Sequence, residues 1–124
     1  MTKEKADTID VNKELEELPA LISYQEQLME NIILEIAEAK NEKNKKVAET
    51  IMKYEKSPFM VQKAMIKKTQ ADEETKILVL KKKMSEISVE FNRLRNRFQS
   101  IRKLASLRIE EMKHGLEYRK EVDN

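Results

Sequence analysis

The chain has 124 residues, with 25 Lys or Arg against 23 Asp or Glu, so its formal net charge is only +2. It contains one glycine, two prolines and no cysteine. Sheet proteins need frequent turns and turns favour glycine, so this composition argues against all-β and α/β folds. The absence of cysteine excludes disulfides, thiolate metal sites and thiol nucleophiles.

Apolar content and patterning indicate a folded helical protein. Leu, Ile, Val and Phe supply 31 residues, a larger share than the roughly one fifth below which chains rarely collapse. The weighting toward Ala, Glu, Lys and Leu is typical of long helices. No apolar run approaches the ~20 residues of a membrane span, and the first residues lack the apolar core of a signal peptide. We therefore expect an all-α, soluble, cytoplasmic protein with no membrane partner.

The first predicted helix follows a polar, aperiodic segment over residues 1–13, which we expect to be a flexible tail before a single helical domain over 14–115. Apolar residues then recur at alternating steps of three and four, which places them on one seam of a helix. Pro19 suits the first turn of a helix, so the pattern predicts a helix over about 19–56. The seam comprises Leu18, Ile22, Met29, Ile32 and Ile36, and Gln25 interrupts it.

The seam disappears in the basic run after Lys40 and resumes, shifted, at Val47, Ile51 and Tyr54. Such a shift is typical of a helix that continues past a stutter in its heptads. Ser57 and Pro58 then predict a helix end and a new start.

Two further helices are predicted, over about 58–68 and 72–114, because the stretch from Thr69 to Glu74 offers a second cap with acids in the first turn. The alternative, in which 59–70 is continuous with the last helix, stays open. Gly115 is placed where a helix would stop, so residues 116–124 are expected to form a flexible tail. The last helix carries the longest seam, with Ile77, Leu80, Met84, Ile87, Phe91, Leu94, Phe98 and Ile101.

Charge segregation favours an antiparallel pairing of the first and last helices. Residues 1–40 hold ten acids and four bases, a net −6, and residues 41–124 hold thirteen acids and twenty-one bases, a net +8. If 59–68 folds back, Glu26, Glu30 and Glu35 fall near Arg102, Arg97 and Arg93. The predicted fold is a long antiparallel helical hairpin or a three-helix coiled-coil bundle. Apolar residues off the seams form a second stripe, which predicts a homodimer or larger homo-oligomer.

Catalytic chemistry has little support in this sequence. Catalytic groups usually converge from loops, and few loops are predicted. Glu111 and His114 match the Glu-x-x-His spacing of di-metal bundles, but Met112 occupies the seam, so His114 points away from it. A histidine near a helix end is the simpler interpretation. We expect no enzymatic activity, metal, cofactor or small-molecule substrate.

A basic cluster in the last helix is the candidate nucleic-acid site. Arginine binds phosphate through a planar, permanently charged fork, and several cations along one helix could follow a nucleic-acid backbone. Alternatively, Arg95, Arg97 and Arg102 flank the seam, where charges normally pair across helices. The cluster comprises Lys82, Arg93, Arg95, Arg97, Arg102 and Lys103.

The stretch EFNRLRNRFQSIR over residues 90–102, with the heptads around it, resembles small coiled-coil proteins encoded in early regions of phages and prophages of Gram-positive bacteria. The resemblance implies a small cytoplasmic accessory protein that acts on DNA replication, recombination or a host factor. If the protein is encoded by a phage, this cytoplasm is that of the host. It implies no catalytic residue. The first functional hypothesis is a self-associating accessory or inhibitor protein that binds a protein partner. The second is a nucleic-acid-binding accessory protein that uses the basic cluster.

Overall fold

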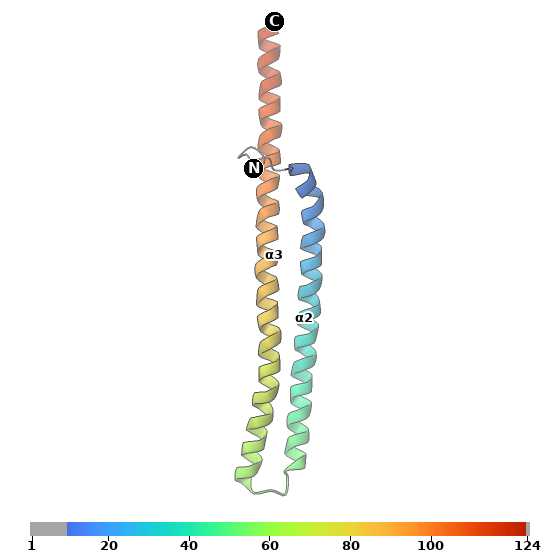
Figure 1. The fold of residues 1–124 in the computed structure, drawn as a ribbon, viewed down its shortest axis with the longest axis vertical. Helices are drawn as coiled ribbons and strands as arrows, with labels where there is room; N and C mark the ends of the chain where they lie inside the picture. Colours follow the sequence, from blue (N-terminus) through green and yellow to red (C-terminus); the bar gives the residue numbers. More distant parts are fainter. Residues whose placement is uncertain (1–9, 124) are drawn as a thin grey trace, which may run out of the picture. The chain divides into compact units, whose positions relative to one another are not determined.

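The computed structural model describes residues 10–123, and their side chains over residues 10–115. These residues form two long helices packed together, α2 (Val11–Lys53) and α3 (Phe59–Asp123), which confirms the all-α prediction (Figure 1). Where the sequence predicts one domain over 14–115, packing divides the chain into two units. Unit 1 combines the residues up to Tyr24 with those from Glu90 onward, and unit 2 is Gln25–Val89. Neither helix carries a segment long and apolar enough to span a membrane.

Helix α2 begins two turns before the predicted start. The Asp10 carboxylate accepts a hydrogen bond from the Lys13 backbone N–H at 3.0 Å, which is the geometry of an N-cap. Pro19 lies inside the helix, so the predicted start at Pro19 is wrong. The free energy gained by burying Val11 and Leu18 offsets the cost of the backbone hydrogen bond that Pro19 cannot donate. Residues 1–9 of the predicted tail lie outside the described residues.

The turn between the helices is held by backbone and side-chain hydrogen bonds. The Ser57 N–H donates to the Tyr54 carbonyl at 2.9 Å. The Gln62 side-chain amide reaches back and donates to the carbonyls of Glu55 and Ser57, each at 2.9 Å. The Pro58 carbonyl accepts the first bonds of α3. The helix break predicted at residues 57 and 58 is therefore present.

Helix α3 continues through both places where the sequence predicts an interruption. The Thr69 hydroxyl does not cap a new helix but donates to the Met65 carbonyl of the preceding turn at 3.0 Å. Gly115 does not have a positive φ, and the helix runs on to Asp123. The separate helices over 58–68 and 72–114 are thus one helix, and the described residues contain two helices instead of three. The helical backbone also includes residues 116–123 of the predicted C-terminal tail.

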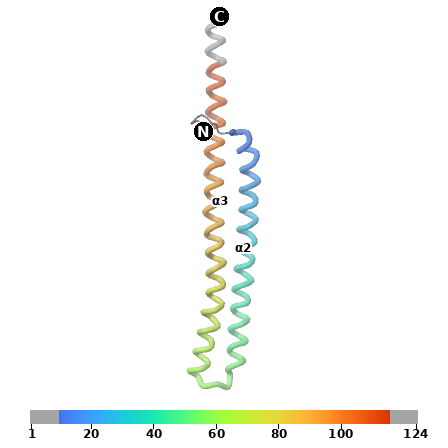
Figure 2. Tube along the Cα trace, viewed as in Figure 1, coloured from blue at the N-terminus to red at the C-terminus, as the bar shows by residue number. Residues whose placement is uncertain are grey.

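In unit 1, the start of α2 lies beside the orange part of α3 (Figures 1 and 2), and the core lies between these two segments. Val11 and Leu18 pack with Leu94 and Ile101, and Ile101 is only 1% exposed. Partly buried side chains surround them: Leu15, Ile22, Phe98, Leu104 and Ala105. Two helices can bury only one stripe each, so this core stays small.

In unit 2, the second half of α2 and the first half of α3 lie side by side and antiparallel, joined by the turn (Figure 1). Ile32 and Ile77 are its buried apolar residues. Ser88 on α3 contacts the Met29 sulfur on α2 at 3.8 Å. The apolar packing therefore belongs to the half of unit 2 that lies away from the turn.

The seam residues predicted over 18–36 and 77–101 all lie in buried or half-buried positions of their units. Ile51, which the shifted seam predicts to face inward, is exposed instead, and its neighbour Thr50 is half-buried. The buried or half-buried seam residues are Leu18, Ile22, Met29, Ile32, Ile36, Ile77, Leu80, Met84, Ile87, Phe91, Leu94, Phe98 and Ile101.

Candidate interaction surfaces

A layer of charged side chains lies between the helices of unit 2. Glu73 is 5% exposed and is the one buried charged residue among those described. Its Oε1 accepts hydrogen bonds from Lys46 and Lys76, each at 3.1 Å. Next to it, Lys43 contacts Glu74 at 2.9 Å. We call these five residues the polar layer, and it replaces the apolar seam at this level of the hairpin.

The polar layer shifts the proton equilibria of its own members. Hydrogen bonds from Lys46 and Lys76 lower the pKa of the Glu73 carboxyl, against a smaller opposing effect of burial. The same bond to Glu73 raises the pKa of Lys46. Both shifts favour the charged pair, so this contact is ionised at neutral pH.

One turn closer to the loop, two threonines meet across the helices. The hydroxyl oxygens of Thr50 and Thr69 are 3.0 Å apart. Each hydroxyl also lies within hydrogen-bond distance of a carbonyl four residues earlier in its own helix, at 2.8 and 3.0 Å. Two hydroxyl protons can complete only two of these three contacts at once. The inner face of unit 2 near the turn therefore includes polar side chains beside half-buried apolar ones such as Met65.

The outer side of the same turn carries large apolar side chains beside exposed Lys53 and Lys56. The exposed large apolar residues are Ile51, Met52, Phe59, Met60 and Val61, which we call the apolar tip. Met52, Phe59 and Met60 are 74%, 73% and 76% exposed. Sequence reasoning missed the apolar tip because it assigned Ile51 to the seam and treated 59–68 as a weakly amphipathic helix.

The candidate nucleic-acid residues are divided between the two units, because Lys82 lies in unit 2 and the other five lie in unit 1. Arg93 pairs with Glu90 in its own helix at 2.6 and 2.9 Å. These bonds lower the pKa of Glu90 and raise that of Arg93. Arg97 crosses to Glu14 on α2 at 2.9 Å.

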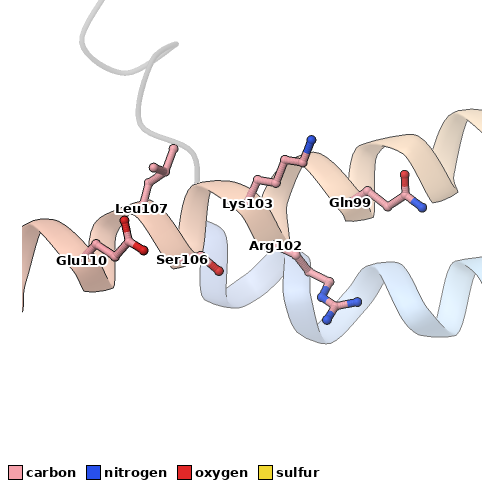
Figure 3. A pocket seen from close by; sticks show the side chains of 6 residues that line it. All are labelled: Gln99, Arg102, Lys103, Ser106, Leu107 and Glu110. Atoms are coloured by element: carbon pink, nitrogen blue, oxygen red, sulfur yellow. The ribbon is translucent and has the colours of Figure 1, made fainter.

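The remaining basic residues make no ion pair within the described part of the chain. Arg102 stacks over the Phe98 ring, 5.8 Å from its centre. Arg95 and Lys103 are exposed and have no acidic side chain within 4.0 Å in that part. The exposed face that includes Arg102 and Lys103 also carries Gln99, Ser106, Leu107 and Glu110 (Figure 3). All six side chains come from α3, so they form the surface of one helix and not an enclosed site.

Two of the arginines that the sequence places near Glu26, Glu30 and Glu35 pair with acids of their own unit. Arg97 contacts Glu14 instead, and Arg93 contacts Glu90. The expected pairs assumed that residues 59–68 fold back as part of the turn. The turn instead lies at residues 54–58, and 59–68 are the first residues of α3.

A groove of about 410 Å³ lies in unit 1 where α2 begins. On α3 it is lined by Ala105, Arg108, Ile109 and Met112, and on α2 by Val11 and its neighbours. We call it the end groove. Arg108 and Met112 continue the seam spacing of α3 past Ala105, next to the first turn of α2. Both are exposed, and Met112 is 68% exposed.

Glu111 and His114 are exposed residues of α3. Among the residues that the structure describes, no three His, Asp or Glu side chains gather where they could hold a metal ion.

Comparison with known proteins found no similar protein. No family model, no curated protein and no solved structure matches this chain.

Proposed function

We propose that the protein is a non-enzymatic, self-associating helical accessory protein of the cytoplasm, and that two copies pair through their end grooves. The observation that carries the proposal is the exposed continuation of the α3 seam at Arg108 and Met112. A seam that continues where its partner helix does not cover it leaves apolar side chains in water, and a second helix can cover them.

Charge balance makes a second copy a suitable occupant of the end groove. Residues 105–115 carry two bases, Arg108 and Lys113, and two acids, Glu110 and Glu111. A neutral segment with both signs can face itself across a two-fold axis without net repulsion, as isologous dimers require. Dimer formation would enlarge the small core of unit 1, and the outer helix surfaces would remain available for a partner protein.

Light scattering during size exclusion, from micromolar to millimolar protein, tests this proposal. We expect the wild type to shift from monomer to dimer as concentration rises. The double variant Ile109→Glu, Met112→Glu should stay monomeric, because two added charges cannot be buried in the interface without a partner. The control is Leu21→Glu, Tyr24→Glu, which places the same two charges on exposed sites of unit 1 outside the end groove. A wild type that stays monomeric at all concentrations would overturn the proposal.

Nucleic-acid binding is the second candidate function, and the cations that lack an acidic partner, Arg95 and Lys103, favour it. Fluorescence anisotropy with labelled DNA at two salt concentrations tests it. The double variant Arg95→Gln, Lys103→Gln should lose more affinity than Arg93→Gln, Arg97→Gln, whose arginines already pair with acids. Equal losses, or no binding by the wild type at low salt, would reject this candidate.

A further inference from the structure

The turn region of unit 2 has polar side chains on its inner face and large apolar side chains that are exposed. Thr50, Thr69 and the buried Glu73 occupy the inner face. Met52, Phe59 and Met60, which would normally fill such a core, face outward and are about three-quarters exposed. Large exposed apolar side chains on both sides of one turn are candidates for an interaction site.

Helix geometry explains why the apolar tip cannot turn inward. Phe59 and Met60 are consecutive, so they project about 100° apart, and the inward positions of this end of α3 belong to Gln62, Met65 and Thr69. Side chains also lean toward the N-terminus of their helix, which for Phe59 and Met60 is the turn itself. Phe59 and Met60 therefore point outward at the turn end of unit 2, while Met52 is exposed on the last turn of α2.

The turn that presents these side chains is ordered by its own hydrogen bonds. The Gln62 amide holds the carbonyls of Glu55 and Ser57, and Ser57 bonds back to Tyr54. A preorganised turn loses little conformational entropy when it docks. The exposed apolar side chains are therefore a persistent feature of unit 2.

The charge around the apolar tip is positive. Residues 51–68 contain five lysines and one acid, a net +4. None of these lysines has an ion pair within the part of the chain that the structure describes. A second copy of the apolar tip would bring like charges together, so self-association at this site is disfavoured. The complementary occupant is anionic.

We infer that the apolar tip docks on an anionic lipid surface, with Phe59 and Met60 entering the interface while Lys53, Lys56 and Lys63 contact the headgroups. Apolar side chains beside lysines are the composition of segments that lie in a membrane interface. Side chains that project from the end of a hairpin can enter a deformable lipid surface more readily than side chains along the face of a helix can. The inference departs from the expectation of no membrane contact, and it involves no membrane span.

A single tryptophan introduced at the apolar tip reports the docking directly, because the chain has no tryptophan of its own. The variant Phe59→Trp should show a blue-shifted emission with phosphatidylglycerol-containing vesicles and no shift with pure phosphatidylcholine vesicles. Leu78→Trp, on an exposed site of α3 farther from the turn, is the reference and should not respond. Circular dichroism checks that both variants keep the wild-type helicity.

Charge and apolar variants made in the Phe59→Trp background separate the two contributions. Lys53→Gln, Lys56→Gln, Lys63→Gln should weaken vesicle affinity by about fivefold per lysine. The matched control Lys81→Gln, Lys82→Gln, Lys83→Gln removes the same charge elsewhere in unit 2 and should have a much smaller effect. Met52→Ser, Met60→Ser should weaken affinity by on the order of tenfold or more.

Four results would overturn the inference. They are no shift with anionic vesicles, an equal shift for Leu78→Trp, an equal response to both lipid types, and a shift with polyglutamate but not with vesicles. The last result would assign the apolar tip to an acidic protein partner.

Discussion

Gly115 lies within helix α3, where neither its backbone conformation nor a close contact requires a glycine. A Cβ built on it meets no atom within 4 Å, and its φ is not positive. We therefore expect Gly115→Ala to raise the free energy of unfolding by about 0.5–1 kcal/mol, because alanine lowers the entropy of the unfolded chain. Urea unfolding measures this change. A loss of stability would instead indicate the helix stop that the sequence predicts.

Ile101 is the most deeply buried side chain of unit 1. Ile101→Ala should lower the free energy of unfolding by about 2–5 kcal/mol, since it removes apolar contacts and leaves a cavity. Ile109→Ala makes the same chemical change on an exposed site and should stay within roughly 0.5 kcal/mol of wild type. Thermal unfolding of dilute protein compares them, and equal effects would contradict the packing of unit 1.

Glu73 makes the stability of unit 2 depend on pH. Its pKa is lowered in the folded state, so its contribution is complete above the ordinary carboxyl pKa of about 4.3 and is lost as pH falls through the lowered value. The variant Glu73→Gln should therefore melt below wild type at pH 7, and the gap should close in acid. The control Glu86→Gln, at an exposed site, should match wild type throughout. A gap that persists in strong acid would show that the polar layer acts through shape and not charge.

At the scale of the element, the continuity of α3 through Thr69 and Gln70 is the main departure from the sequence prediction. Threonine followed by acids is a common cap, but the same residues are tolerated inside a helix when a hydroxyl can bond the preceding turn. Thr69 makes that bond and also meets Thr50 on the other helix. Packing against α2 therefore decides between a cap and a continuous helix.

The variant Gln70→Pro tests this continuity. Gln70 is exposed, so a proline there would remove a backbone hydrogen bond without disturbing side-chain packing, at a cost of about 3 kcal/mol. Thermal unfolding followed by circular dichroism should show a large loss of stability. Gln70→Ala should be neutral or slightly stabilising. If the proline were tolerated, residues 69–71 would be a loop.

At the scale of the whole molecule, each of the two packing units has its own narrow core. Unit 1 buries Val11, Leu18, Leu94 and Ile101, while unit 2 buries Ile32, Ile77 and the charged Glu73. Small cores bury little apolar area, so they offset the conformational entropy that a long chain loses on folding only narrowly. Association through the end groove would supply additional buried apolar area.

If the end grooves pair, stability should depend on protein concentration. A dimer that dissociates on unfolding gains stability by mass action, so the melting temperature should rise as concentration increases. The variant Ile109→Glu, Met112→Glu should melt at one temperature at all concentrations. Differential scanning calorimetry over a wide concentration range checks both. A wild-type melting temperature that is independent of concentration would contradict pairing through the end grooves.

The sequence by itself determined the all-helical class, the turn near Pro58 and the residues of the seam. These features follow from local rules: helix-forming composition, proline at a helix start, and apolar spacing near the helical period. The candidate basic residues could also be named from the sequence, because charge is a property of composition.

Only the tertiary structure decided which residues pair. Local signals at Pro19 and Thr69 predicted helix ends, but burial of Val11 and Leu18 and the contact between Thr50 and Thr69 favour continuous helices. Those contacts join residues far apart in sequence, and the energy of packing exceeds the local preferences for a cap or a stop. For the same reason, the polar layer around Glu73 and the outward-facing apolar tip could be recognised only once both helices were in place.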